Sequence, residues 1–149
     1  MDAFIDTSIL IPAIIECPDS DFVRNFIQTT EYRLIISPLI YHEAMYVGTK
    51  ILLRERFEIE SIAALRKHIH KNGYRNISDF IDRLNLLVND FSFCADSTNI
   101  QMISQMADKY HLLSGDALIL TTCMEHNISA LATFDHDFQK IDGLHLLFI

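Results

Sequence analysis

The sequence contains 149 residues, of which 50% are hydrophobic and 21% are charged, and these proportions exclude a disordered or fibrous chain. Because 20 Asp and Glu residues outnumber 12 Lys and Arg residues, the formal net charge is −8. This balance argues against nucleic-acid binding through bulk positive charge, so a polyanionic partner would need a local basic patch or a bound cation.

In chain order, the first half predicts a strand over residues 3–5, a helix around 22–27, a strand over 34–36, a helix from 38 to about 53 and a helix over 61–71. The second half predicts a helix around 81–88, a strand over 91–95, helices around 100–107 and 114–124, and strands over 130–133 and 144–148. Ser37, Ser78 and Ser114 are predicted N-caps, and Gly73 is a predicted helix end.

Most of these strands lack alternation of apolar and polar residues, which is typical of parallel strands covered on both faces. We therefore expect an α/β fold with a mostly parallel five-stranded sheet and a helical insert in the middle of the chain. The sequence has no internal repeat and no linker rich in Pro, Gly or Ser, which predicts a single domain over residues 1–149.

The cysteines and the apolar segments predict the cellular compartment. Cys17, Cys94 and Cys123 are scattered among apolar residues, which is not the pattern of a disulfide framework or a metal-ligand pair and fits a reducing cytoplasm. No apolar run is long enough for a membrane helix, and the apolar N-terminal segment lacks the basic lead-in of a signal peptide. We expect a soluble cytoplasmic protein.

Four acidic residues occupy positions where a solvated charge is not expected. Asp6 and Asp135 follow predicted strands, while Glu43 and Asp116 share helical faces with apolar residues. Because the carboxyl ends of parallel strands meet at one edge of the sheet, all four are predicted to converge there. Few Lys or Arg residues are close in sequence, so a divalent cation is the simplest neutralising partner, and carboxylate ligands favour Mg²⁺ or Mn²⁺.

Each acid also has a structural interpretation when it is taken alone. Asp116 could stabilise a helix N-terminus, and Asp6 could cap the helix that follows it. Asp135 and Asp137 could be turn residues, and Glu43 could extend to solvent. The hypothesis of a site depends on all four acids occurring at one edge.

The sequence resembles the PIN-domain ribonucleases, particularly the VapC-type toxins of prokaryotic toxin–antitoxin pairs. The matching motifs occur in order over nearly the whole chain, and residues 54–90 match no motif. They are Phe4-Ile5-Asp6-Thr7-Ser8, Pro38-Leu-Ile-Tyr-His-Glu43-Ala, Asp116-Ala-Leu-Ile-Leu and Leu131-Ala-Thr133-Phe-Asp135-His-Asp137-Phe138.

The resemblance implies a three-layer PIN-like fold and an endoribonuclease that uses Mg²⁺ or Mn²⁺, leaving a 3′-hydroxyl and a 5′-phosphate after attack by water. By motif position, the catalytic and metal-binding residues would be Asp6, Glu43, Asp116 and Asp135. The supporting residues would be Thr7, Ser8, Thr133 and Asp137. A small antitoxin protein and a homodimer are also implied. The helical spacing of Phe22, Phe26, Ile27, Met102 and Met106 is that of either core residues or a dimer face, and the resemblance favours pairing through such helices.

Basic residues concentrate in the middle of the chain. Residues 50–83 contain eight Lys and Arg against five Asp and Glu, a local charge of +3 that leaves −11 for the remainder. This segment is either a solvated helix face or a surface for the RNA backbone. The RNA-binding candidates are Arg66, Lys67, Lys71 and Arg75. His42 and His136 neighbour site acids and could touch substrate or face solvent.

Four other functions compete with the hypothesis of a toxin nuclease. A haloacid-dehalogenase-type phosphatase needs a second Asp two residues after the first, where this chain has Ser8. A receiver domain with Asp96 as phospho-acceptor would need paired acids at the first strand end. A non-catalytic PIN-like binding or dimerisation module, or a PIN nuclease of RNA processing without an antitoxin, also fits the sequence.

Overall fold

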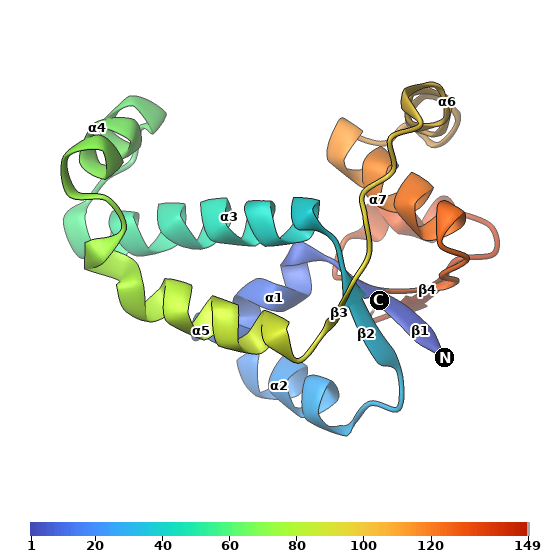
Figure 1. Cartoon of the computed structure of the whole chain (residues 1–149), viewed down its shortest axis with the longest axis horizontal. Coiled ribbons are helices and arrows are strands. Elements are labelled where there is room, and N and C mark those ends of the chain that lie inside the picture. Colours follow the sequence, from blue (N-terminus) through green and yellow to red (C-terminus); the bar gives the residue numbers. More distant parts are fainter. Residues whose placement is uncertain (149) are drawn as a thin grey trace.

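The fold is built on a five-stranded, fully parallel sheet with strand order β3-β2-β1-β4-β5 (Figure 1). The computed structural model describes residues 1–148. Its strands are β1 (Asp2–Ile5), β2 (Arg33–Ile36), β3 (Ser92–Phe93), β4 (Ala130–Ala132) and β5 (His145–Leu147). Its α-helices are α1 (Thr7–Ile14), α2 (Ser20–Thr29), α3 (Pro38–Phe57), α4 (Ile62–Asn72), α5 (Ser78–Asn89), α6 (Ile100–Tyr110) and α7 (Ser114–Glu125). Short 3₁₀ turns are η1 (Arg75–Ile77) and η2 (His136–Lys140).

The sequence-based prediction of an α/β fold with a parallel five-stranded sheet is confirmed. All five strands lie where the apolar runs predict them, although β3 contains only two residues instead of five. The middle of the chain is helical, as expected. The helix α1 is absent from the predicted elements in chain order and is implied only by the capping interpretation of Asp6; it carries Pro12 in its interior.

Helices cover both faces of the sheet. Contacts join α1 to α2, α3 and α5 in one layer, while α6 packs on α7 in another. Residues 3–5 of β1 and all of β4 are buried between these layers, which explains why these runs are continuously apolar. Among residues 1–148, no helix is both long and apolar enough to cross a membrane.

The long helix α3 extends beyond the sheet and carries the central helical insert. Near its middle, Gly48 lies against the buried ring of Phe80 on α5, so closely that a Cβ atom at position 48 would lie 2.0 Å from the Phe80 Cζ atom. The helix ends at Glu58, whose φ of 54° is left-handed. From there α4 projects on the same side of α3 as α6 and α7 do (Figure 1).

The predicted N-caps are correct in part. Ser37 is the N-cap residue of α3, but its side chain makes no cap hydrogen bond, and the Leu39 amide donates to Asp96 Oδ2 instead, at 3.0 Å. The Ser78 and Ser114 predictions are wrong by one residue, because these serines are the first residues of their helices. Gly73 ends α4, as predicted, with a φ of 58°.

Candidate active site

The carboxylate of Asp6 lies at the end of the central strand β1 and is held by hydroxyl groups. Its Oδ2 accepts from the Ser8 hydroxyl at 2.6 Å and from the Thr133 hydroxyl at 2.8 Å, and its Oδ1 accepts from the Thr7 amide at 2.7 Å. The same hydroxyls accept from the backbone that follows β4, Ser8 from the Phe134 amide and Thr133 from the Asp135 amide. These bonds join the ends of β1 and β4 into one rigid edge.

Glu43 reaches this edge from α3. The Thr7 hydroxyl donates to its Oε2 at 3.0 Å, and the Glu43 side chain is half-buried. A Cβ atom at Gly115 would lie 3.2 Å from Glu43 Oε1, so the glycine lets the first turn of α7 approach the carboxylate. The helices α3 and α7 therefore both bring an acid to the end of β1.

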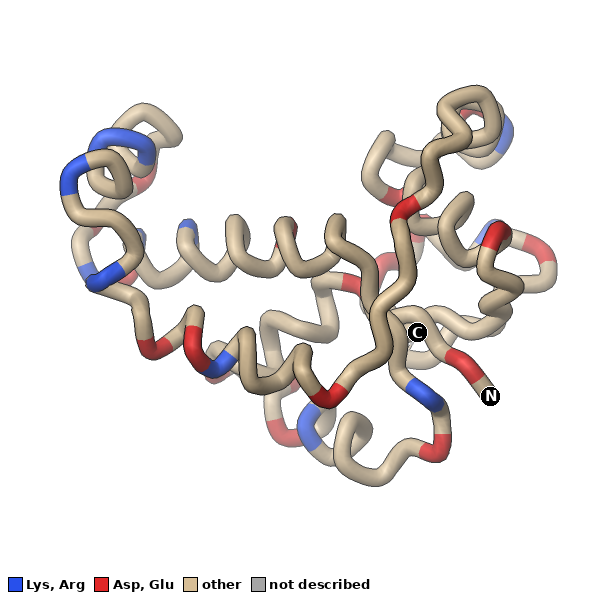
Figure 2. Tube along the Cα trace, in the orientation of Figure 1, with Lys and Arg blue, Asp and Glu red and all other residues tan. Residues whose placement is uncertain are grey.

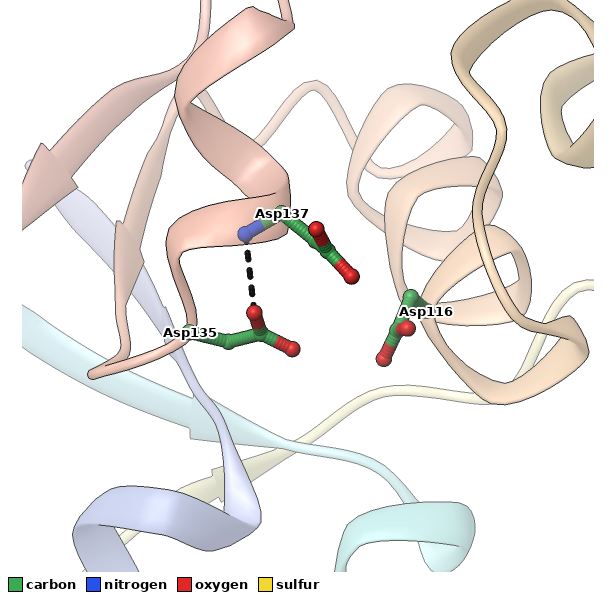
Figure 3. A group of neighbouring side chains, drawn as sticks. All are labelled: Asp116, Asp135 and Asp137. Atoms are coloured by element: carbon green, nitrogen blue, oxygen red, sulfur yellow. Dashed lines mark hydrogen bonds between the residues drawn. The ribbon is translucent and has the colours of Figure 1, made fainter.

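The other three acids form a cluster across the gap between α7 and η2 (Figure 3). Asp116, Asp135 and Asp137 each offer a carboxylate oxygen, and these atoms lie within 4.8 Å of one another. The Asp137 amide donates to Asp135 Oδ1 at 2.8 Å, which fixes the turn that brings both aspartates toward Asp116. Lys140 is the one Lys or Arg of residues 1–148 that pairs with a site acid, and its Nζ lies 3.9 Å from Asp137 Oδ1.

The electrostatics of Asp116 connect all five acids. Partial burial, followed by the negative charges of Asp135, Asp6, Asp137 and Glu43, raises the pKa of Asp116 from 3.8 to about 6. A helix N-terminus alone would lower this pKa, because the macrodipole stabilises a carboxylate there. The macrodipole interpretation of Asp116 is therefore outweighed by burial and by repulsion from the acids around it.

For two other acids, the structural role predicted from sequence is compatible with a place in the acidic site. Asp6 is the N-cap of α1, and Asp135 is the N-cap of η2. Capping uses Oδ1 of each residue, while Asp6 Oδ2 faces the two hydroxyls. Local turn chemistry thus positions both carboxylates at the edge of the sheet, and Asp135 Oδ2 accepts no hydrogen bond within residues 1–148.

Thr133 is a positioning residue, because it is fully buried and bonded to both Asp6 and Asp135. Thr133→Val keeps the shape but leaves the Asp135 amide unpaired. We expect the free energy of unfolding to fall by about 1–3 kcal/mol, measured by urea unfolding, with a loss of any activity that depends on Asp6. Thr133→Ser retains the hydroxyl and serves as the control. Equal stability of the Val and Ser variants would contradict this role.

The two histidines beside the site acids give no evidence of a common binding site. His42 and His136 are both exposed, and His136 Nδ1 pairs with the Gln139 side chain at 3.0 Å. The residues predicted for dimerisation are partly covered by the chain itself, since the Phe148 ring packs against those of Phe22 and Phe26. Phe22 remains 60% exposed.

Two residues contribute more than the motifs predict. Asp137, a supporting residue by motif position, belongs to the group of carboxylates that lie within 4.8 Å of one another, because η2 turns it toward Asp116. Gly115 is in none of the motifs. Its place directly before Asp116 was the available signal, since a small residue there permits the approach of Glu43.

Comparisons with known proteins agree with this architecture. A PIN domain family model matches residues 3–144. Ribonuclease VapC6 of Methanocaldococcus jannaschii is 26% identical in sequence, with 98% of this chain and 96% of that protein covered.

Two solved structures share the fold. Mycobacterium tuberculosis VapC20, described as a toxin that cleaves the sarcin–ricin loop, matches with a TM-score of 0.58 at 13% identity over 93% of each chain. Rickettsia felis VapBC2, solved with a DNA fragment from its promoter, matches with a TM-score of 0.62 at 18% identity, with 99% of this chain and 98% of that chain covered.

Proposed function

Because the chain belongs to the PIN domain family, we propose that it is a metal-dependent endoribonuclease whose active site is the acidic edge of the sheet. One observation carries this proposal, namely that Asp116, Asp135 and Asp137 each place a carboxylate oxygen within 4.8 Å of the others at this edge. Unneutralised acids at this spacing destabilise a fold, so their concentration at one strand edge is typical of a cation site.

The donor set fits a hard divalent cation. Asp116, Asp135 and Asp137 supply only oxygen atoms, at a mutual spacing of at most 4.8 Å, which suits Mg²⁺ or Mn²⁺ better than Zn²⁺. Asp6 and Glu43 complete the acidic edge. When bound, the cation would supply the positive charge that stabilises phosphodiester hydrolysis.

The remaining roles belong to residues of the chain itself. Ser8 and Thr133 hold Asp6 in one orientation, and Thr7 holds Glu43. Fixed carboxylates reduce the reorganisation needed during the reaction, which is the usual source of electrostatic catalysis. No Ser–His or Cys–His nucleophile is required for this chemistry.

The proposed activity is tested by removing and restoring the metal. Purified protein is incubated with a mixture of RNAs in Mn²⁺ or Mg²⁺, and then with EDTA. We expect cleavage to occur in the presence of metal, to stop with EDTA and to return with excess Mn²⁺, with 5′-phosphate ends on the products. The Asp6→Asn protein is the control for contaminating nucleases. If wild-type and Asp6→Asn proteins cleave equally in Mn²⁺, the proposed site is wrong, and a non-catalytic binding module becomes the better hypothesis.

The likeness to VapC6 and VapC20 supports a more specific role. We propose that the protein is the toxin of a type II toxin–antitoxin pair, that it acts in the cytoplasm as a homodimer, and that a small antitoxin protein holds it inactive. A PIN nuclease of RNA processing would share the active site but would lack such a partner. Co-expression with the product of a neighbouring small reading frame separates the two, because only a toxin would be rescued from growth arrest.

The basic residues of the insert are proposed to attract the RNA backbone. Arg66, Lys67, Lys71 and Arg75 are exposed, and none of them forms an ion pair within residues 1–148. Figure 2 shows the basic positions gathered at the end of the molecule formed by α4, away from the acids of the sheet edge. This separation lets the basic residues of α4 and the acidic site act on different parts of one RNA.

Reversing three of these charges tests their contribution. In a Lys67→Glu, Lys71→Glu, Arg75→Glu protein, we expect weaker RNA binding and a flatter plot of log affinity against log salt concentration, the slope falling by about one for each lost phosphate contact. Fluorescence anisotropy at several salt concentrations provides the measurement. An unchanged slope would show that these residues face only solvent.

A further inference from the structure

A hollow of about 430 Å³ lies between α3 and α4, outside the acidic site. This volume falls in the range of pockets that hold small organic groups. Five of its lining residues are aliphatic, namely Val47, Ile51, Ile59, Ile62 and Leu65. The other four, Lys50, Arg54, Glu60 and Ser61, are exposed polar residues.

The hollow opens on the same face of α3 as Glu43. At 100° per residue, Val47, Lys50 and Arg54 each fall within about 40° of Glu43 around the helix axis. Lys50 is about 10 Å from Glu43 along the axis and Arg54 about 16 Å. A strand of RNA whose phosphate lies at the acidic edge can therefore reach the hollow within a few nucleotides, along one continuous side of one helix.

The charge of the hollow favours a polyanion. Lys50 forms no ion pair within residues 1–148, and its Nζ lies 5.5 Å from the ring centroid of Tyr46, which is itself 42% exposed. Arg54 pairs with Glu60 at 3.8 Å, but both side chains are more than 70% exposed, so a phosphate can replace this carboxylate at little cost. Cations and an aromatic ring beside an apolar recess are the elements that bind single-stranded nucleic acids.

We propose that this hollow is a nucleotide subsite of the nuclease: its aliphatic walls receive an unstacked base, while Lys50 and Arg54 contact the adjoining phosphates. Single-stranded RNA is the ligand, because a base inside a duplex cannot leave the stack without loss of pairing. The proposal rests on the proposed RNA substrate, and it assigns selection of the cleavage position to the insert.

The test compares variants that make equal charge changes at different places. The probes are two fluorescein-labelled oligonucleotides of about 12 nucleotides, a random-sequence RNA pool and an abasic ribose-phosphate chain. They are titrated into Asp116→Asn protein, which is expected to bind without cleaving. Lys50→Glu with Arg54→Glu is compared with Arg33→Glu with Lys109→Glu, since Arg33 and Lys109 are exposed and lie outside both the hollow and the basic residues of α4.

We expect the Lys50/Arg54 double variant to raise the Kd for the RNA pool by about tenfold or more, and the matched double variant by about threefold or less. Ile62→Gln, at a position already 55% exposed, should raise the Kd for the RNA pool by about fivefold and leave that for the abasic chain unchanged, because it removes an apolar wall without adding charge. Leu86→Gln on α5, at a 68% exposed position, should change neither Kd. Circular dichroism verifies that each variant is folded.

Several results would overturn the proposal. If both double variants raise the Kd for the RNA pool equally, Lys50 and Arg54 act only through long-range charge and not through contacts in the hollow. Loss of dimerisation without loss of RNA affinity would make a second copy of the chain the occupant, and loss of antitoxin binding alone would make it a protein segment.

Cleavage of the RNA pool in Mn²⁺ is measured in parallel on proteins with Asp116 intact. Cleavage that is insensitive to the hollow variants would refute the subsite and leave the nuclease function standing. Binding through the hollow without any cleavage would refute the nuclease instead.

Discussion

Replacing Asp116 by Asn is expected to lower the rate of RNA cleavage by about 100-fold or more and, in the same protein, to raise the stability of the metal-free fold. The loss of rate follows because Asn removes one of three carboxylates that lie within 4.8 Å of one another. The gain in stability follows because the charged form of Asp116 is disfavoured by burial and by four neighbouring acids.

The pH dependence of stability provides the measurement. Because the pKa of Asp116 is raised from 3.8 to about 6, the folded protein holds this proton more tightly than the unfolded chain between these values. The stabilisation is fully present below pH 3.8 and is lost as the pH rises through 6. With allowance for solvent screening, Asp116→Asn should therefore gain about 1–2 kcal/mol over wild type at pH 8 and little at pH 4, in urea unfolding with EDTA present.

Metal should reverse this order of stability. At the proposed metal site, Mn²⁺ would neutralise the acids of the wild type and bind less well to Asp116→Asn, so saturating Mn²⁺ should raise the unfolding temperature of the wild type more than that of the variant. A variant that is less stable than wild type at pH 8 without metal would contradict the electrostatic account. A variant that cleaves at the wild-type rate would remove Asp116 from the active site.

Gly48→Ala is expected to give the largest loss of stability of the single substitutions considered, about 3 kcal/mol in the free energy of unfolding. The added Cβ would lie 2.0–2.7 Å from three ring carbons of Phe80, and that ring is fully buried. The helix α3 cannot move away freely, because it also carries Glu43, which the Thr7 hydroxyl holds at the sheet edge. We expect the variant to lose RNA cleavage in proportion to the fraction unfolded.

A compensating substitution separates steric overlap from helix propensity. Phe80→Leu removes the ring atoms that meet the new Cβ, so the double variant should be more stable than the sum of the two single effects predicts, by about 1 kcal/mol or more. Additive effects in urea unfolding would show that the Gly48–Phe80 contact is not the cause. Since Ala favours helix over Gly, propensity alone would make Gly48→Ala stabilising.

Local sequence patterns were sufficient to predict the positions of the strands and the places of four acids at the sheet edge. Apolar runs define β1 and β4, and an acid that directly follows such a strand must lie at the carboxyl edge of a parallel sheet. The helical period likewise placed Glu43 on the inner side of α3, where Thr7 contacts it.

Features that depend on distant residues escaped prediction. The amide of Leu39 is capped by Asp96, 57 positions away in sequence, and nothing in the Ser37-Pro38 pair indicates this. The left-handed turn at Glu58 sets the direction of α4, and thereby creates the hollow. The position of Asp137 in the acidic cluster depends on the 3₁₀ turn η2, which the bond from the Asp137 amide to Asp135 helps to form.

The helix α4 contributes one buried side chain, that of Leu65, although it contains 11 residues. Most of its positions can therefore accept substitution with little effect on folding, since exposed residues change stability by small amounts. The acids at the sheet edge have no such freedom, because each is tied to its neighbours by burial, charge or a hydrogen bond. On the proposed assignment of α4 to RNA binding, substitutions on α4 would change which RNA is recognised while the acids at the sheet edge stay the same.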